Sequence, residues 1–412
     1  MPKIIPFKAV RPTRDKIGLV AARSYQSYSK KGRKFRMERN PYSFLHILNP
    51  GYKYKKKIKG KERFKLVQNR YNEFKEDGIF MQEEHPAFYA YKIIDRDGNV
   101  FYGFLGAASV HDYENNLIKK HEDTIADREE LFKEYLDTAG FNAEAVLLTH
   151  PNDPTLASIL DDISQERAEY EFTTTYRDTH YLWPITDSAS INTIQDAFAK
   201  MEHLYIADGH HRSASSYLLS KKHKEENPSV KKESAYDYFM SYLIPESHLI
   251  IKEFNRLLKD LNGLSKEEFL IELDAIFRIQ NRGITAYQPS KKHHFSMYLD
   301  GEFYSLYLRK KQYPFTTALD TLDTHILQKT VLEPILGIHD IRDDSRITYV
   351  NGKKGITYMK TLVDSGDYAV GFHMLPITIE ELKEIANEGL TMPPKSTYIE
   401  PKLRSGVTIY EF

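Results

Sequence analysis

A short polar stretch in the middle of the chain has the composition of an anion-binding turn. It follows the apolar run Tyr205–Ala207 and precedes a predicted helix start at Ser213. The residues between are Asp208, Gly209, His210, His211 and Arg212. A strand, a tight turn and a helix N-terminus together offer backbone N–H groups and the positive end of a helix dipole. Arg212 could contact a phosphate through two N–H groups, and the histidines could add donors. The alternative is a polar loop that caps a helix, but three consecutive nitrogen-bearing side chains favour an anion or nucleotide site.

Two further polar segments could take part in chemistry. His121 and Glu122 stand before a predicted helix, where Glu122 could also be a capping acid of the first turn. Ile125 occupies the position where a zinc peptidase helix needs its second histidine, which argues against that activity. Near the end of the chain, Lys395, Ser396 and Thr397 could offer an ammonium group and two hydroxyls to an anion. This segment is too rich in proline for regular structure, and the alternative to anion binding is a terminal strap packed on the surface.

The composition narrows the class of protein. The 412 residues include 58 Lys+Arg and 58 Asp+Glu, so no net charge points to nucleic acid or membrane. There is no cysteine, which excludes disulfides, a thiolate nucleophile and cysteine-ligated metal. Met1–Phe7 lacks the apolar region of a signal peptide, and no apolar run approaches the roughly 20 residues that span a bilayer. We therefore expect a soluble, cytoplasmic protein.

Interleaved strand and helix patterns predict an α+β fold with mixed sheets. The strongest signals are a helix over 62–77 that ends at Gly78 and a hairpin of 87–94 with 100–106. A helix with an apolar face of Ile125, Leu131, Phe132 and Leu136 should end at Gly140, and 40–50 reads as a short strand between two Asn-Pro turns. We expect an N-terminal region, 1–235, and a C-terminal region, 236–412, that returns Lys395–Thr397 to the site; the two could also form one compact unit. Other expected helices are 155–163, 190–201, 266–273, 320–329 and 379–388, and other expected strands are 145–148, 238–244, 249–254, 346–350 and 368–372, with a strand pair over 293–308.

A strongly basic run stands apart from this pattern. Between Lys30 and Lys65 there are fourteen lysines and arginines but only two acids, Glu38 and Glu62. Such a run is usually a solvated, mobile face. The alternative is a surface that attracts phosphates.

Three motifs follow one another along the chain: Lys120–Thr124 (KHEDT), Ile206–Arg212 (IADGHHR) and Met392–Lys402 (MPPKSTYIEPK). Together they resemble a bacterial family of unknown function that is similar to free-serine kinases of the ParB/sulfiredoxin-like superfamily. Shorter stretches at 6–12, 40–45 and 332–338 agree with the resemblance, which covers nearly the whole chain.

The resemblance implies a ParB/sulfiredoxin-like core around the turn and transfer of phosphate from ADP or ATP, with Mg²⁺, to the hydroxyl of free L-serine. In this reading Glu122, beside His121, acts as the base. The predicted phosphate- and nucleotide-binding residues are Asp208, Gly209, His210, His211, Arg212, Lys395, Ser396 and Thr397. Phosphoryl transfer depends on positioning and charge stabilisation, which these residue types can supply.

One departure keeps other functions open. Many members of the family have a Pro-Tyr-Asp motif where this chain has Arg23–Tyr28. A second hypothesis is a nucleotide-responsive binding protein without metabolic activity that uses Lys30–Lys65 to bind a polyanion, nucleic acid included. Glu122 argues against it, because a switch needs no base beside the transferred phosphate. A third hypothesis is a phosphoester hydrolase that uses the same turn.

Overall fold

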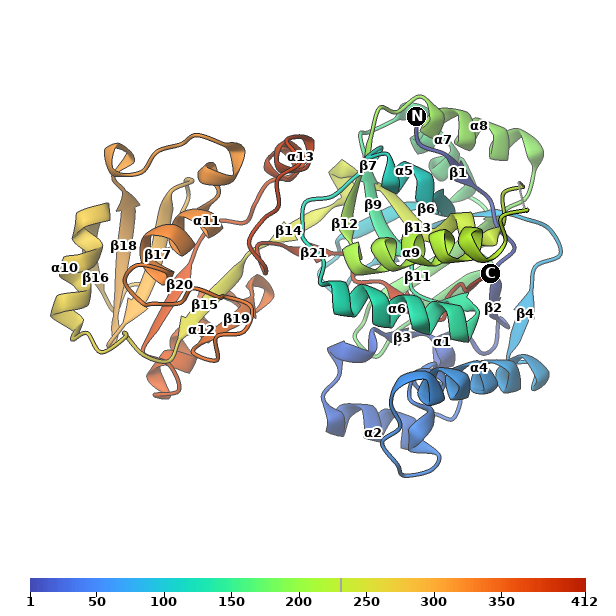
Figure 1. The fold of residues 1–412 in the computed structure, drawn as a ribbon, viewed down its shortest axis with the longest axis horizontal. Helices are drawn as coiled ribbons and strands as arrows, with labels where there is room; N and C mark the ends of the chain where they lie inside the picture. The colour runs from blue at the N-terminus through green and yellow to red at the C-terminus, as the bar shows by residue number, and fades with distance from the viewer. Residues whose placement is uncertain (230–231) are drawn as a thin grey trace. The chain divides into compact units, whose positions relative to one another are not determined.

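The computed structural model describes residues 1–229 and 232–412, whose contacts form two units. Unit 1 comprises residues 1–120, 124–249 and 401–412, and unit 2 comprises 121–123 and 250–400 (Figure 1). The predicted division between residues 235 and 236 remains a prediction; strand β13 (Tyr238–Pro245) is part of the main sheet of unit 1. No helix among the described residues is both long and apolar enough to cross a membrane.

Within the described residues, unit 1 is built on a nine-stranded mixed sheet. Its order is β10-β11-β5-β6-β13-β9-β12-β7, with β1 paired to β6. The β13–β9 and β12–β7 pairs are parallel, and the other pairs are antiparallel. The strands are β1 (Ile4–Ile5), β5 (Phe88–Ile94), β6 (Val100–Ser109), β7 (Ile118–Lys119), β9 (Val146–His150), β10 (Tyr170–Thr173), β11 (Thr179–Ile185) and β12 (Leu204–Asp208). The predicted hairpin is confirmed as β5 and β6, and the predicted α+β class is confirmed.

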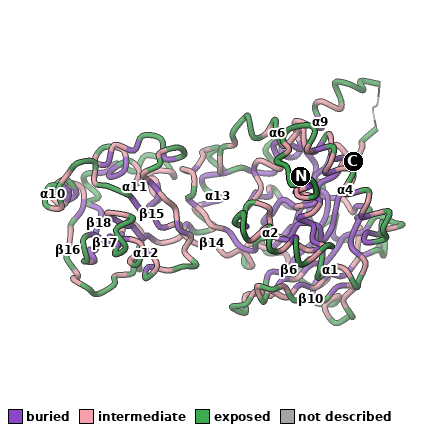
Figure 2. Tube along the Cα trace, turned by 90° about the horizontal axis from the view of Figure 1, so that it is seen from below, coloured by how far each residue is buried: buried purple, intermediate pink, exposed green. Residues whose placement is uncertain are grey.

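Helices cover this sheet, and the buried residues concentrate in its strands (Figure 2). The helices are α1 (Ile17–Val20), α2 (Lys30–Arg39), α3 (Leu45–Leu48), α4 (Gly60–Glu76), α5 (Val110–Glu114), α6 (Ala126–Ala139), α7 (Pro154–Ile163), α8 (Ser188–Ala199) and α9 (His210–Glu226). Short strand pairs complete the unit: β2 (Val10–Pro12) with β4 (Phe80–Gln82), β3 (Ala22–Arg23) with β22 (Arg404–Ser405), and β8 (Phe141–Asn142) with β23 (Tyr410–Glu411).

Helix α4 confirms the predicted helix and its buried face of Phe64, Val67, Tyr71 and Phe74. Gly140 ends α6 with φ +78°, as predicted. The predicted apolar face of α6 is partly wrong, because Ile125 and Leu131 are exposed and only Leu136 of the predicted four is buried.

The strand predicted over 40–50 is wrong, since that segment contains helix α3. Asn40 does form a turn, with its carbonyl accepting the Ser43 N–H, but the chain then enters a helical turn rather than an extended strand. The apolar residues of α3 are packed into the core beside α4, and this tertiary packing overrides the local extended pattern.

Unit 2 is built, among the residues described, on a six-stranded antiparallel sheet with the order β16-β18-β17-β20-β15-β19. Its elements are β15 (Phe254–Leu258), α10 (Lys266–Ile276), β16 (Phe277–Gly283), β17 (His294–Leu299), β18 (Glu302–Leu308), α11 (Asp323–Leu327), β19 (Ile347–Asn351), α12 (Gly355–Asp364), β20 (Val370–His373) and α13 (Ile379–Asn387). The helix predicted over 320–329 is divided, with a π-helical turn over Gln328–Leu332 after α11. The expectation of no regular structure near the C-terminus is wrong, because β21 (Tyr398–Glu400) pairs with β14 (Ile250–Lys252).

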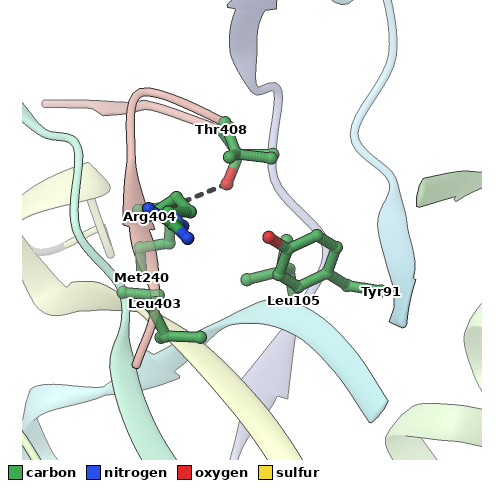
Figure 3. A pocket seen from close by; sticks show the side chains of 8 residues that line it. Tyr91, Leu105, Met240, Leu403, Arg404 and Thr408 are labelled. Atoms are coloured by element: carbon green, nitrogen blue, oxygen red, sulfur yellow. Dashed lines mark hydrogen bonds between the residues drawn. The ribbon is translucent and has the colours of Figure 1, made fainter. Parts of the chain in front are cut away.

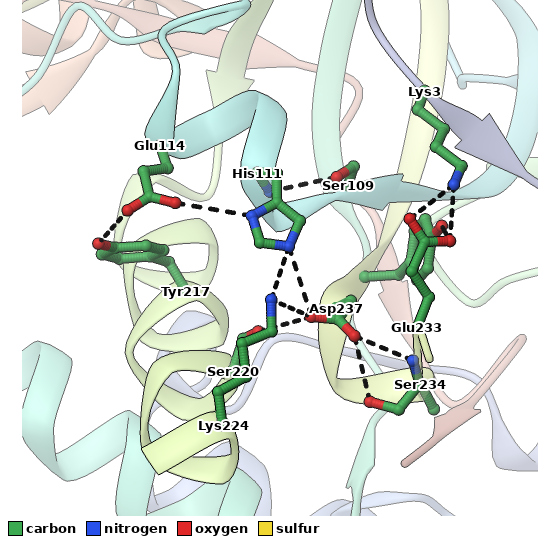
Figure 4. A network of polar contacts seen from close by, with 12 residues as sticks. Lys3, Ser109, His111, Glu114, Tyr217, Ser220, Lys224, Glu233, Ser234 and Asp237 are labelled. Atoms are coloured by element: carbon green, nitrogen blue, oxygen red, sulfur yellow. Dashed lines mark hydrogen bonds and ion pairs between the residues drawn. The ribbon is translucent and has the colours of Figure 1, made fainter. Parts of the chain in front are cut away.

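A polar network fixes the C-terminal half of α9 in unit 1 (Figure 4). The buried carboxylate of Asp237 accepts a hydrogen bond from Ser220 at 3.1 Å and forms an ion pair with Lys224 at 2.7 Å. Burial alone would raise the pKa of Asp237, but hydrogen bonds from Lys224 and from the Ser234 backbone outweigh it and lower the pKa below its ordinary value. The network therefore holds the far end of the helix that begins at the predicted anion-binding turn.

We predict that Asp237→Asn destabilises unit 1 by about 2 kcal/mol at pH 7, because it removes a buried charge that accepts several hydrogen bonds. The lowered pKa means that this stabilisation is present above the ordinary pKa of aspartate and is lost as pH falls through the lowered value. Urea unfolding should therefore show a difference between variant and parent that shrinks toward pH 2. The exposed Asp162→Asn serves as a control and should change stability little at either pH.

Candidate functional site

The predicted strand, turn and helix around Asp208 are present in unit 1. Strand β12 ends at Asp208, Gly209 has φ +107°, and α9 follows at once. The helix begins at His210, three residues earlier than predicted, because the Gly209 carbonyl already accepts hydrogen bonds from the N–H groups of Arg212 and Ser213. The three consecutive nitrogen-bearing side chains therefore lie in the first turn of α9, at the positive end of the helix dipole.

Arg212 folds back over the glycine. Its guanidinium donates a hydrogen bond to the carbonyl of Ala145 and lies 3.6 Å from the Asp208 carboxylate. A Cβ placed on Gly209 would stand 3.0–3.1 Å from the guanidinium. Glycine is thus required twice, for its positive φ and for the close approach of this arginine.

Lys402 is a member of this site that the sequence did not predict as a site residue. Its ammonium lies 3.3 Å from the same oxygen of Asp208 that faces Arg212. Residues 401–412 belong to unit 1, so the end of the chain returns to the turn. The sequence signal for Lys402 is its position as the last residue of the third motif. Of that motif, only Lys395–Thr397 are predicted as anion-binding residues.

His211 holds the segment that precedes α6. The N–H of Ile125 donates to its Nε2 at 3.2 Å. Burial and the nearby Arg128 lower the pKa of His211, which keeps the ring neutral at pH 7 and able to accept this bond. Thr124 is hydrogen-bonded to Glu129, and the backbone of Glu129 accepts from Ser215 of α9. Contact of His211 with a phosphate remains a prediction, and only Nδ1 would be available for it.

The sheet places a second strand end at the same edge. Strand β7 runs parallel to β12, with Ile118 opposite Leu204 and Lys119 opposite Tyr205. Both strands therefore point their carboxyl ends in the same direction. Lys120 comes directly after β7, and the next three residues, His121–Asp123, belong to unit 2.

In unit 2, two of the three motifs are in contact. The Met392 N–H donates to the carbonyl of His121 at 2.9 Å, and the Thr391 hydroxyl donates to Asp123 at 3.0 Å. Asp123 also lies 3.9 Å from Arg342. The first and third motifs thus meet through backbone and side-chain contacts that the sequence had not specified.

Two of the three predicted residues of the third motif, Lys395 and Ser396, have contacts of their own within unit 2. Lys395 is exposed, has φ +59°, and its carbonyl accepts from Arg256. The buried Ser396 hydroxyl donates to Pro393 at 2.6 Å and contacts Thr324 at 3.2 Å. Binding of an anion by Lys395–Thr397 remains a prediction, as does one cleft shared by these residues, Glu122 and the Asp208–Arg212 turn.

Unit 1 also contains a pocket beside Ala145 (Figure 3). Its only charged lining group is Arg404, which pairs with Asp178. None of the eight lining residues is a predicted site residue; they are Tyr91, Leu105, Ala145, Met240, Leu403, Arg404, Val407 and Thr408. The pocket is therefore a neighbour of the Arg212 contact rather than part of the predicted site.

Comparison with known proteins identifies the family. The profile of the family described as "Protein of unknown function (DUF1015)" matches residues 4–325, well over half of the 412-residue chain. The chain belongs to DUF1015. The predicted membership of a family of unknown function is thereby confirmed, and the relation of this DUF1015 protein to a ParB/sulfiredoxin-like core remains a prediction. A search of curated proteins found no match.

Several solved structures are similar to this DUF1015 chain at low identity. C-terminally truncated SbnI from Staphylococcus aureus is 13% identical with a TM-score of 0.40, over 74% of this chain and 85% of that one. Free serine kinase in complex with AMP is 13% identical with a TM-score of 0.33, over 71% and 88%. A conserved hypothetical protein from Pyrococcus furiosus is 12% identical with a TM-score of 0.32, over 71% and 90%. At these scores the likeness carries no argument about chemistry.

We predict that Gly209→Ala in this DUF1015 protein costs about 1–3 kcal/mol, since alanine is strained at this φ, and also displaces Arg212. Urea unfolding measures the first effect, and affinity for pyrophosphate measures the second. Gly140→Ala is the matched control: its φ is +78° but the nearest atom to an added Cβ is 3.8 Å away. Gly140→Ala should lose stability but keep the pyrophosphate affinity of the parent protein. Equal pyrophosphate affinity in both variants would contradict a role for the folded-back arginine.

Proposed function

We propose that this protein transfers phosphate from ADP or ATP to the hydroxyl of a small amino acid, with free L-serine as the first acceptor to test. The observation that carries the proposal is the junction of β12 and α9, where Gly209 and the folded-back Arg212 place a guanidinium at a helix N-terminus. Helix N-termini attract phosphate through N–H groups and the helix dipole, and arginine adds charge and direction.

The charges around Asp208 support this assignment. Asp208 faces both Arg212 and Lys402, so one carboxylate holds two cations at the turn. A bound phosphate would be attracted by both Arg212 and Lys402. It could accept hydrogen bonds from the guanidinium N–H groups that do not donate to the Ala145 carbonyl. We assign the phosphate contacts to Arg212, Lys402 and the first turn of α9, which includes His210 and His211. Asp208 is the positioning residue. The third motif contributes Lys395–Thr397.

Glu122 is the proposed base. Both neighbours of His121–Asp123 belong to unit 1: Lys120 follows β7, and Thr124 precedes Ile125, which is bonded to His211. The proposal takes Glu122 to act at the turn because it is the acid of a three-residue segment that is joined at both ends to unit 1. In the proposed step Glu122 takes the proton of the acceptor hydroxyl, the hydroxyl oxygen forms a bond to phosphorus, and the bond from phosphorus to the departing nucleotide oxygen breaks. His121 is assigned a place beside Glu122 in this step.

Magnesium is expected to arrive with the nucleotide. The turn in unit 1 offers mainly nitrogen donors, and its carboxylate is held by two cations. Mg²⁺ prefers oxygen ligands and usually keeps several waters and substrate phosphate oxygens. The turn therefore suits phosphate rather than a bare metal ion, and no part of the proposed step depends on a protein ligand to magnesium.

We predict that ADP or ATP at 100 times its dissociation constant stabilises the parent protein by about 2.7 kcal/mol. Arg212→Ala should weaken nucleotide binding about tenfold or more, because it removes a charge-assisted hydrogen bond to phosphate. Thermal melts with ADP, ATP, CTP and pyrophosphate, each with Mg²⁺, measure both effects. The exposed Arg128→Ala, which removes one positive charge near His211, is the matched control. No shift of the parent with any nucleotide would end the nucleotide assignment.

We further predict that Glu122→Gln lowers phosphoserine formation by about 10²–10⁴-fold while nucleotide affinity stays nearly unchanged, because the amide keeps the shape but cannot accept the proton. Serine, threonine and homoserine are the acceptors to compare. Glu130→Gln makes the same change on α6 and should retain activity. Full turnover by Glu122→Gln would show that Glu122 is not the base and would favour its alternative role as a capping acid. Nucleotide binding without transfer by the parent would favour a nucleotide-responsive binding protein, and release of inorganic phosphate would favour a hydrolase.

A further inference from the structure

The basic run of unit 1 lies outside the proposed phosphate site and has a structure of its own. It comprises α2, α3, a turn over Pro50–Lys57 and the start of α4. Helix α3 contacts both α2 and α4, so the segments form one packed body at the blue end of unit 1 (Figure 1). The expected solvated face is present, because its lysines are exposed, and its mobility remains a prediction. We call this face the lysine surface and define it as Lys30, Lys31, Lys34, Lys53, Lys55, Lys56, Lys57, Lys59, Lys61 and Lys65.

Arginines and lysines of the run have different surroundings. Arg33 donates to the carbonyl of Tyr28 at 2.7 Å, Arg36 donates to Thr175, and Arg63 donates to the carbonyl of Leu48 at 2.8 Å. Within the described ranges, Lys34 is the only member of the lysine surface in an ion pair, with Glu38 at 3.7 Å. These three arginines are engaged in hydrogen bonds, of which that of Arg63 joins α4 to α3, whereas the lysines are exposed.

The positions of these lysines oppose the stability of the helices. Lys30 and Lys31 occupy the first turn of α2, which contains no acid, and Lys59 and Lys61 flank the uncapped start of α4. Positive charge at a helix N-terminus is unfavourable because it meets the positive end of the dipole. Lys30, Lys31, Lys59 and Lys61 stand at these two helix starts against one acid, Glu62 in the first turn of α4, and they create a positive field that a polyanion would neutralise.

The turn between the helices is tightly built. The N–H of Lys56 donates to the carbonyl of Gly51, and a Cβ on Gly51 would stand only 2.4 Å from the carbonyl oxygen of Lys56. Lys55 adopts φ +52°, a conformation that is uncommon for residues other than glycine. The lysines thus project from a defined backbone rather than from a free tail.

Two exposed aromatic rings accompany the lysines. Phe35 lies next to Lys34, and Tyr54 lies between Lys53 and Lys55; each residue is 52% exposed. Exposed rings among free lysines are the combination that single-stranded nucleic acids bind, with bases stacked on rings and phosphates near ammonium groups. An anionic membrane would require a continuous apolar face, whereas Met37 of α2 is buried inward and the Phe35 ring carries the Arg39 guanidinium 4.2 Å from its centroid.

We infer that the lysine surface binds single-stranded nucleic acid without reading its sequence. Phosphates would contact the lysines of the turn and of the two helix starts, and bases would stack on Tyr54 and Phe35. This inference is independent of the proposed kinase activity, because none of these residues belongs to the Asp208–Arg212 turn.

The test measures binding of fluorescent 20-nucleotide oligo-dT and oligo-U, a 20-base-pair duplex, and phosphatidylserine vesicles to the full-length protein. We expect both single strands to bind more tightly than the duplex. If about four phosphates are neutralised, affinity should fall roughly fifty-fold between 50 and 200 mM salt. Tyr54→Ala should lose about fivefold or more for the single strands, because it removes a stacking ring.

The charge variant is Lys53→Glu with Lys56→Glu and Lys57→Glu, which leaves Lys55 and its φ untouched, and it should lose about tenfold or more. Its matched control, Lys291→Glu with Lys310→Glu and Lys311→Glu, makes the same charge change on exposed lysines of unit 2 and should bind like the parent. Lysine-to-glutamine changes at 53, 56 and 57 replace the charge variant if its melt shows loss of the fold. Equal losses in both triple variants, duplex binding as tight as single-strand binding with no effect of Tyr54→Ala, or binding of vesicles alone would each overturn the inference.

Discussion

The left-handed backbone of Gly209 is the constraint on which the candidate site depends. It lets the chain leave β12 and enter α9 without an intervening loop, and its carbonyl accepts the first two helical hydrogen bonds. Because the glycine has no side chain, Arg212 can lie against it and reach Ala145, the residue just before the neighbouring strand β9. One residue conformation thus places a guanidinium, a helix N-terminus and a strand end at the same point.

The charge balance of the turn depends on residues distant in sequence. Asp208 and Arg212 are local, but Lys402 arrives through the C-terminal segment, which is held by pairing of β22 with β3 and of β23 with β8. At the other end of α9, Asp237 compensates Lys224 and bonds Ser220 (Figure 4). The helix is therefore fixed at both ends by carboxylates that each face a lysine, and its first turn cannot shift without disturbing one of them.

The sequence predicted what local pattern determines. The β5–β6 hairpin, the buried face of α4 and the end of α6 at Gly140 follow from turn residues and periodicity, and all are present. Tertiary context decided the rest. Leu45–Leu48 of the 40–50 segment form a helix against the core, and the proline-rich C-terminal segment forms β21 because β14 offers it a partner. Lys402 was not predicted because its contact with Asp208 joins positions nearly two hundred residues apart.

The different use of arginine and lysine links the two regions of unit 1 for which we propose anion binding. A guanidinium offers five N–H donors in a plane, so Arg212 can bond the carbonyl of Ala145 and face Asp208 while other N–H groups stay available for phosphate. An ammonium group is a compact charge with strong hydration, suited to contacts that need no fixed direction. The turn, with its arginine held in one orientation, fits a phosphate that must be placed for reaction, whereas the lysine surface fits a chain of phosphates whose positions can vary. The physical difference between the two side chains therefore argues for two separate ligands rather than one extended site.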